Sequence, residues 1–453
     1  MSIRGLILSS FFKRQLHVIT RSKTNIKPSL PTKSPLKQYN LPLYDCLVHD
    51  LYIPMLFFYP SDNPDGNTPK LRANTTATIS NLLKCSLSQA LSKYYPFAGR
   101  LISASRVDCS DQGVDFFEAR IGCKLSEILD KSLVKGDEYS AHLFPPRSIW
   151  NKVIDRDSSL VRVQLNHFDC GGIAIAASVS HRLGDAATLC SFLCYWANLS
   201  RHSGDHQKSS HFRPHFAYEL LPSSYYHDSV VPEVVYPEKY WVTKEIVFPN
   251  TKIAKLKATM QSQDRVERYT RNELLTALLY QCAVAAAAAT SESGAYAPSV
   301  LFQLVNMRNV MDPPLPESTV GNIASTIHIP TTTESETNLN QLVQRMRKGK
   351  MQLKGTKISS GFELVPPLIN EYMKRNHRVV FISSMCNFPI YQEMDFGWGR
   401  PAKVTLVDTP FVDCITLMDT WSGDGIKAVV SLEQKHMEHF VKNPGLLTYA
   451  SFL

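Results

Sequence analysis

A histidine and an aspartate four positions apart, in the stretch His181-Arg182-Leu183-Gly184-Asp185, are the side chains best suited to chemistry. The stretch follows a predicted strand and precedes a predicted helix, where an imidazole can be held rigidly and directed into a cleft. Its usual pKa near 6.5 suits a general base at neutral pH. In a continuous helix His181 and Asp185 would share a face and could ligate a metal. The change from strand to helix turns Asp185 away instead, no third ligand is suggested nearby, and the pattern alone also fits a core histidine.

A second unusual stretch, Asp395-Phe396-Gly397-Trp398-Gly399, places two glycines around a tryptophan behind a carboxylate. The glycines indicate a backbone that turns tightly or approaches another segment closely, and Asp395 can accept hydrogen bonds that hold the turn. Alone, the stretch also fits a structural turn beside a strand. Its occurrence together with the His181 stretch favours a functional role.

The elements predicted around His181 are two strands followed by a helix. Val161–Phe168 alternates apolar and polar side chains, residues 169–172 supply a turn with two glycines, and Ile173–Ser180 is a second strand. A helical period then runs over residues 186–199. Polar, aperiodic residues 201–215 are the candidate linker between two halves. The same reasoning predicts strands at 51–59, Ser299–Asn306, 404–407, 414–418 and 427–432, and helices at 79–95, 273–289 and Leu339–Leu353.

The formal charge of +9, from 49 Lys and Arg against 40 Asp and Glu, is concentrated at the N-terminus. Eight basic residues and no acid precede Asp45, which leaves 41 basic and 40 acidic side chains in the rest of the chain. A nearly neutral body argues against nucleic-acid binding, because that function needs a basic field on the folded surface. Six basic residues at 345–357 are interpreted as the solvated face of a helix rather than a phosphate or calmodulin contact.

The basic N-terminus has two interpretations. Apolar side chains at Ile3, Ile7 and Phe11, separated by Arg, Lys and Ser, resemble an amphipathic organellar presequence. Such short patterns also arise by chance, and a solvated tail ahead of the first strand is the favoured interpretation. No secretory signal is convincing. We therefore expect a cytoplasmic protein, with organellar import as the alternative.

Several other classes of protein are disfavoured. The ten cysteines show no Cys-x-x-Cys spacing, so neither a structural zinc site nor a secreted disulfide framework is expected. The apolar run at 274–289 is too short and too rich in alanine to span a bilayer and is expected to be a buried helix. There is no Gly-x-Ser-x-Gly elbow of a serine hydrolase and no Gly-rich phosphate loop.

The His181 and Asp395 stretches, about 210 residues apart, together resemble the BAHD acyltransferase family of plants. The resemblance covers nearly the whole chain and is closest to the branch of vinorine synthase-like acetyltransferases. Further stretches similar to family segments are Ile26 to Thr32, Tyr95-Pro96-Phe97-Ala98-Gly99-Arg100, Phe168-Asp169-Cys170-Gly171-Gly172, residues 270–277, Asn306-Met307-Arg308 and Gly321-Asn322.

The resemblance implies an α/β monomer of two similar chloramphenicol-acetyltransferase-like domains. Each would be a mixed sheet with flanking helices, and an active-site channel between them would admit acyl-CoA and an alcohol from opposite faces. We divide the chain into a basic leader at 1–25, an N-terminal domain at 26–205, a linker at 206–220 and a C-terminal domain at 221–453.

The resemblance also implies roles for individual residues. His181 would be the general base that takes the proton from the acceptor hydroxyl, and Asp395 matches a position often described as essential and is assigned as catalytic. Asp185 would be structural and paired with Arg308. Supporting positions that keep the channel in shape for CoA would be Gly397, Trp398 and Gly399.

The chain departs from the family just before the Asp395 stretch. Family members commonly carry Ser/Thr-x-Trp there, with the tryptophan near the oxyanion, whereas this chain has Ser383-Ser384-Met385 and then Asn387 in place of a usual Arg. A methionine side chain cannot donate a hydrogen bond. Ser383 and Met385 are therefore assigned to the acceptor pocket or the vicinity of the oxyanion, and we prefer the hypothesis that Met385 enlarges the pocket for a polycyclic alcohol. Stabilisation of the oxyanion by a backbone amide or water, or a weaker site, is the alternative.

The predicted function is O-acetylation by acetyl-CoA of a hydroxyl on a plant alkaloid or terpenoid. Acetyl-CoA would be a co-substrate, and no bound cofactor, metal, nucleic acid or membrane span is expected. The alternatives are another donor, such as malonyl-CoA or benzoyl-CoA, and a non-catalytic binding relative.

Overall fold

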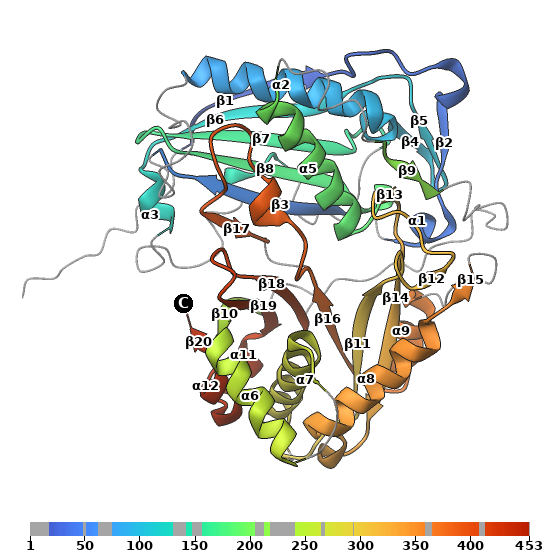
Figure 1. Cartoon of the computed structure of the whole chain (residues 1–453), viewed down its shortest axis with the longest axis vertical. Helices are drawn as coiled ribbons and strands as arrows, with labels where there is room; N and C mark the ends of the chain where they lie inside the picture. Colours follow the sequence, from blue (N-terminus) through green and yellow to red (C-terminus); the bar gives the residue numbers. More distant parts are fainter. Residues whose placement is uncertain are drawn as a thin grey trace, which may run out of the picture.

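The protein consists of two α/β units, each built on one mixed sheet, which lie one above the other in Figure 1. The expected fold class of two sheet-containing α/β domains is confirmed. The computed structural model describes residues 18–48, 51–61, 75–129, 142–146, 156–203, 213–217, 241–263, 268–292, 294–357, 365–406 and 413–452.

The first sheet has six strands in the order β1-β6-β7-β8-β3-β17. Strands β6 and β7 are parallel, and the other neighbours are antiparallel. The predicted pair β7 and β8 has the predicted bounds, and Gly171 in its turn adopts a φ of 82°, which glycine tolerates without strain. The strands are β1 (Val18–Ile26), β3 (Tyr52–Tyr59), β6 (Val114–Ile121), β7 (Val161–Phe168), β8 (Ile173–Ser180) and β17 (Lys403–Thr405).

Two helices, α2 (Thr76–Lys93) and α5 (Ala186–Arg201), cover the outer face of the first sheet (Figure 1). Their apolar faces join the alternate side chains of β7 in one core, and Trp196 on α5 donates to the carbonyl of Leu83 on α2 at 3.1 Å. The shorter elements of this unit are η1 (Ser34–Leu36), β2 (Gln38–Asn40), α1 (Leu43–Leu47), η3 (Tyr95–Ala98), β4 (Arg100–Ser103), β5 (Arg106–Asp108), α3 (Leu125–Leu129), η4 (His181–Leu183) and β9 (His215–Phe216).

The second sheet has seven strands in the order β14-β11-β16-β18-β19-β10-β20. Strand β16 is parallel to both of its neighbours, and the other pairs are antiparallel. The strands are β10 (Trp241–Pro249), β11 (Ser299–Asn306), β14 (Ala324–Thr331), β16 (Arg378–Ser384), β18 (Cys414–Asp419), β19 (Gly425–Glu433) and β20 (Ser451–Phe452).

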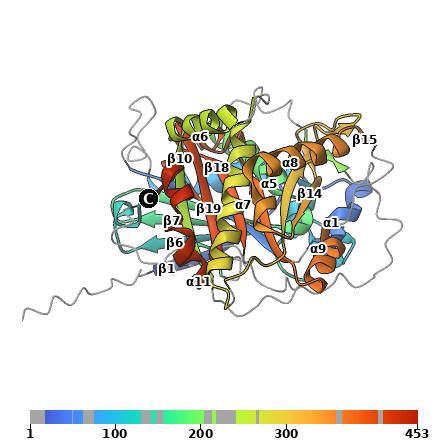
Figure 2. The ribbon, with the colours of Figure 1, turned by 90° about the horizontal axis from the view of Figure 1, so that it is seen from below.

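Helices pack on one face of the second sheet and form its core with it (Figure 2). By length and composition, α7 is the one helix of the described residues that could cross a membrane, and most of it is buried inside the protein. The helices are α6 (Asn250–Gln263), α7 (Arg271–Ala289), α8 (Leu339–Leu353), α11 (Gln434–Phe440) and α12 (Pro444–Tyr449). The remaining elements are β12 (Met311–Asp312), β13 (Thr319–Val320), η6 (Glu334–Thr337), β15 (Thr356–Lys357), α9 (Val365–Lys374) and α10 (Ile390–Glu393).

Two of the predicted boundaries differ from the structure. Residues 18–25, assigned to the leader, belong to β1, which pairs with β6 from Val18 to Ile26. Strand β17 lies in the C-terminal half of the chain but pairs with β3 in the first sheet. A division at the linker therefore does not separate the two sheets, because a late segment returns to the first one. Residues 1–17 and most of the predicted linker lie outside the described residues.

Candidate active site

His181 occupies the turn at the end of β8, on the side of the first sheet that meets the second unit. Its amide donates to the carbonyl of Leu51 at 2.7 Å, which fixes the end of β8 against the start of β3. Gly184 then adopts a φ of 152°, and a Cβ added there would lie 2.5 Å from the side chain of Thr188. Glycine at this position thus permits the sharp change from strand to helix that separates His181 from Asp185.

His181 is half-buried, with its Nδ1 enclosed, in a setting that favours the neutral form of the imidazole. Burial lowers the pKa of His181 below its ordinary value, and this effect outweighs the nearby negative charge of Asp185. Among the described residues, Nδ1 has no hydrogen-bond partner. The carbonyl of His181 accepts from Nδ2 of Asn322 at 2.7 Å, so the backbone of the residue is held across the two units. A neutral imidazole held in this way is able to accept a proton.

Asp185 caps α5 and joins the two units through Arg308. Its Oδ1 accepts from the amide of Thr188 at 3.0 Å, as expected for a residue at the N-terminus of a helix. Nη1 of Arg308 lies 2.8 Å from Oδ2 and Nη2 lies 3.0 Å from Oδ1, so the expected pair is formed and is bidentate. Burial acts to raise the pKa of Asp185, but Arg308 and amide donors outweigh it and hold the pKa below the usual range.

Arg308 is itself enclosed, with 1% of its surface exposed. Its remaining donors reach the carbonyl of Thr319 at 2.8 and 3.0 Å, the carbonyl of Gly321 at 3.0 Å and Oδ1 of Asn306 at 3.1 Å. The guanidinium therefore fastens the segment after β11 and the loop before β14 to the start of α5. Asp185 and Arg308 form a structural joint beside His181 rather than a proton relay.

A buried carboxylate, Asp45 on α1, completes the support of His181. Oδ1 of Asp45 accepts from the backbone amide of Asn322 at 2.5 Å and from its side-chain amide at 2.8 Å. Burial raises the pKa of Asp45 to about 7, against the opposing effect of the Asn322 donors. Asp45 was missed in the sequence because nothing local marks it, and Gly321-Asn322 was noticed only through the family resemblance.

The stretch Asp395 to Gly399 folds on itself against the first unit. Oδ1 of Asp395 accepts from the amides of Gly397 and Gly399, both at 2.8 Å, and these glycines adopt φ values of 114° and 104°. Trp398 is 3% exposed and stacks on Phe396 with ring centroids 5.9 Å apart. The stretch is thus a rigid turn, as its glycines indicate.

Asp395 lies far from His181 along α5, and its assignment as a catalytic residue stays a prediction. The outer oxygen of Asp395 lies 4.0 Å from Arg201, the last residue of α5, whereas Asp185 precedes the first. A helix of 16 residues is about 24 Å long, so Asp395 and the His181 turn lie at opposite ends of α5. The hydrogen bonds from Gly397 and Gly399 to Asp395 favour a role for this carboxylate in holding the turn.

Ser383 and Met385 lie at the end of β16, and only one of them is accessible. Oγ of Ser383 lies 3.0 Å from Oγ1 of Thr416 on β18, and Ser383 is half-buried. Met385 is 6% exposed and is part of the core cluster that contains Tyr391, Met394 and Trp398. The hypothesis that Met385 enlarges the acceptor pocket stays a prediction.

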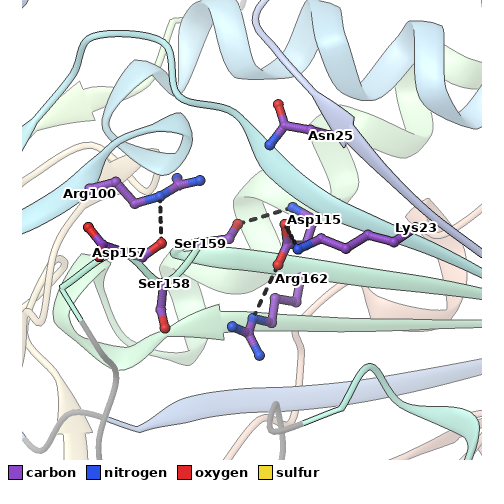
Figure 3. A pocket seen from close by; sticks show the side chains of 8 residues that line it. All are labelled: Lys23, Asn25, Arg100, Asp115, Asp157, Ser158, Ser159 and Arg162. Carbon is purple, nitrogen blue, oxygen red and sulfur yellow. Dashed lines mark hydrogen bonds and ion pairs between the residues drawn. The ribbon is translucent and has the colours of Figure 1, made fainter.

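A separate polar pocket lies on the first unit and lacks the features of a reaction site. In Figure 3 Asp115 lies between Lys23, at 3.0 Å, and Arg162, at 3.8 Å. Nε of Arg100 donates to the carbonyl of Asp157 at 3.1 Å (Figure 3), and Ser159 accepts from the amide of Asp115 at 3.1 Å. The lining side chains thus serve mainly to bind one another. Leu160 directly follows Ser159, and its carbonyl accepts from the amide of Ser180, the residue before His181. The pocket therefore supports the site only indirectly.

The chain thus combines two α/β units with a histidine held where the units meet, an arrangement that the comparisons assign to a family of transferases. A model of the Transferase family matches residues 16–447. The chain belongs to this family, the BAHD acyltransferases, whose members use acyl-CoA as a co-substrate, and it is an acyltransferase.

Relatives and a solved structure agree with this membership. Deacetylvindoline O-acetyltransferase of Catharanthus roseus is 35% identical over 95% of this chain and 97% of its own length. A 17,18-epoxy-17-hydroxycur-19-ene N-malonyltransferase of Strychnos nux-vomica is also 35% identical, over 97% of this chain and 91% of its own. The crystal structure of vinorine synthase superposes with a TM-score of 0.80 at 29% identity and covers 97% of this chain and 99% of its own.

Proposed function

We propose that the protein transfers an acetyl group from acetyl-CoA to a hydroxyl of a plant alkaloid or terpenoid, with His181 as the general base. The observation that carries the proposal is the half-buried imidazole of His181, whose pKa is lowered and whose backbone is held by both units. A base that stays neutral at physiological pH suits abstraction of a proton from an alcohol. The O-acetyltransferase relative from Catharanthus roseus supports the choice of donor and acceptor atom.

The reaction needs no covalent enzyme intermediate. The imidazole of His181 takes the hydroxyl proton while the alcohol oxygen attacks the thioester carbonyl. A tetrahedral intermediate forms, its C–S bond breaks, and the CoA thiolate leaves and takes the proton from the imidazolium. The ester and free CoA are the products, and the imidazole returns to its neutral form. A positioned base of this kind contributes about 10² to 10⁴ in rate.

A second candidate is transfer of a malonyl group to nitrogen, favoured by the N-malonyltransferase relative. The same base could take a proton from the attacking nitrogen. Malonyl-CoA differs from acetyl-CoA by one carboxylate, so the two candidates differ in the charge that the donor site must accept.

The test is incubation of the purified protein with acetyl-CoA, malonyl-CoA or benzoyl-CoA and a panel of polycyclic alcohols and secondary amines, followed by mass spectrometry. We expect the mass gain of one acetyl group on an alcohol. His181→Ala should reduce the rate at least 100-fold without changing the melting temperature. His439→Ala is the matched control, because His439 is exposed on α11 in the second unit. Retention of activity in His181→Ala would remove His181 as the base, and a preference for malonyl-CoA would select the second candidate.

A further inference from the structure

The face of the second sheet that lacks the helical core carries a cluster of aromatic rings. Phe302 on β11 pairs in register with His328 on β14 and with Phe381 on β16, so the three side chains point to one face. The ring centroids of Phe302 and Phe381 are 5.4 Å apart. Tyr372, from α9, meets Phe302 edge-on at 5.8 Å and lies 5.8 Å from His328. We call these four side chains the aromatic face.

The aromatic face is open to solvent along β11. Phe302 is fully buried and forms its floor, while His328, Tyr372 and Phe381 are each partly exposed. Leu304, two residues further along the same face, is 41% exposed although β11 lies between two other strands. Apolar and aromatic side chains that are exposed together in the middle of a sheet form a surface to which a ligand can bind.

The same face leads to His181. Strand β11 ends at Asn306, and two residues later Arg308 binds Asp185. Strand β14 begins at Ala324, and two residues earlier Asn322 binds the carbonyl of His181. Asn306 is four positions after Phe302, a distance of about 13 Å along a strand. A molecule that covers Leu304 and the aromatic face can therefore extend towards His181, as a substrate of the proposed reaction would have to do.

We propose that the aromatic face binds the ring system of the acceptor and selects acceptors that carry a flat aromatic ring remote from the reacting hydroxyl. This inference rests on the proposed function and narrows its acceptor class from alkaloids and terpenoids to aromatic polycycles. The phosphates of CoA need fixed positive charges, and neither Leu304 nor any side chain of the aromatic face is a Lys or Arg. Phe381 and Tyr372 present ring faces and edges for stacking against an aromatic acceptor.

The test compares the variants Tyr372→Leu and Phe381→Leu with Met373→Leu, a control at an adjacent, 59% exposed position. Each protein receives acetyl-CoA and either an indole-containing alcohol or a saturated polycyclic alcohol of similar size. Loss of one aromatic contact should raise KM for the indole-containing alcohol about 3- to 10-fold. KM for acetyl-CoA and the kinetics with the saturated alcohol should stay within about twofold, as should all values for Met373→Leu. Melting temperatures identify any variant whose fold is damaged.

Other results would overturn the inference. Equal increases in KM for both alcohols, or an increase for acetyl-CoA instead, would show that the face does not recognise an aromatic acceptor. Equilibrium dialysis of the indole-containing alcohol against His181→Ala separates this question from the proposed function, because it needs no turnover. Binding that weakens about 3- to 10-fold when Phe381→Leu is added would support the aromatic subsite even if no acetyl transfer were found. Unchanged binding would contradict it.

Discussion

Asp185 and Arg308 form a bidentate ion pair across the two units of the protein, with N–O distances of 2.8 and 3.0 Å. The two residues are 123 positions apart in the chain. The same carboxylate caps α5, and the same guanidinium binds the carbonyls of Thr319 and Gly321. One buried pair therefore orients the turn that carries His181 relative to the second sheet.

Removal of the charge of Asp185 should destabilise the protein strongly. Asp185→Asn leaves the guanidinium of Arg308 buried without its counter-ion, and we expect a loss of about 3 to 5 kcal/mol in the free energy of unfolding. Arg375→Gln serves as the control, because Arg375 and Glu371 form an exposed pair on the surface and its loss should cost about 0.5 kcal/mol or less. Chemical denaturation measures both. A loss below about 1 kcal/mol in Asp185→Asn would show that the pair does not join the two units.

A methyl group at Gly184 should damage the turn more than one at another glycine of positive φ. In Gly184→Ala the new Cβ meets Thr188 at 2.5 Å, and Thr188 is itself held by hydrogen bonds to Gly321. We expect a loss of about 3 kcal/mol and a fall in turnover, because His181 and Asp185 flank the strained residue. Gly423→Ala, at a φ of 71° with no atom within 4 Å of the new Cβ, should cost about 1 kcal/mol and leave turnover unchanged. Equal losses from thermal denaturation of the two variants would contradict the packing argument.

The pH dependence of turnover should report the lowered pKa of His181. Only the neutral imidazole can accept the proton of the alcohol, so activity falls as pH drops through the pKa of His181. Since burial lowers this pKa from 6.5, the acidic limb of the kcat/KM profile should have its midpoint below pH 6.5. The measurement is kcat/KM between pH 5 and pH 9, restricted to the pH range in which the protein stays folded. A midpoint above 7 would exclude His181 in this environment as the titrating base.

Asp45 should make the stability of the protein fall as the pH rises. Its pKa is about 7 when folded and about 3.9 when unfolded, so its favourable contribution is complete below pH 4 and is lost as the pH rises through 7. The variant Asp45→Asn has no titrating group at this position. The difference in free energy of unfolding between the variant and the native protein should therefore shift in favour of the variant between pH 4 and pH 8, by an amount on the order of 4 kcal/mol at most.

The matched control for Asp45 is Asp111, whose pKa shifts in the opposite direction. Burial acts to raise the pKa of Asp111, but hydrogen bonds from Thr32 and the Lys37 ammonium hold it below its usual value. The relative stability of Asp111→Asn should therefore decrease as the pH rises through the acid range. Thermal denaturation of both variants at pH 3, 4.5, 6 and 8 provides the comparison, with the Asp111 effect expected below about pH 4. Parallel trends would contradict the assignment of the Asp45 shift to burial.

The role of Met385 can be tested by restoring the tryptophan usual in the family. Met385→Trp places a larger side chain in a position that is 6% exposed, so overpacking should cost about 1 to 3 kcal/mol. If Met385 enlarges the acceptor pocket, turnover should fall for bulky polycyclic alcohols and persist for small ones. Increased turnover on every alcohol, with no narrowing of the size range, would show that Met385 does not determine acceptor size.

Local sequence patterns predicted several elements of both units closely. The bounds of β7, β8, β11 and α8 are those expected. Helix α8 buries one face and shows it in its periodicity, whereas β8 is buried throughout and is marked by a short apolar run after a glycine-containing turn. Val18–Ile26 was missed as a strand because its burial pattern is almost entirely exposed, so it shows no apolar alternation. A strand that gains its stability from backbone pairing with β6 leaves little trace in residue type.

The sequence by itself determined that a histidine stands at a strand-to-helix turn, with a glycine and a capping aspartate behind it. Only the tertiary structure decided what surrounds that histidine. Asn322 and Asp45 come from distant segments and support its backbone, while Asp395 lies at the other end of α5 despite its unusual sequence. The physical reason is that periodicity and turn chemistry are local properties, whereas burial, pKa and ion pairing depend on which distant segments the fold brings together.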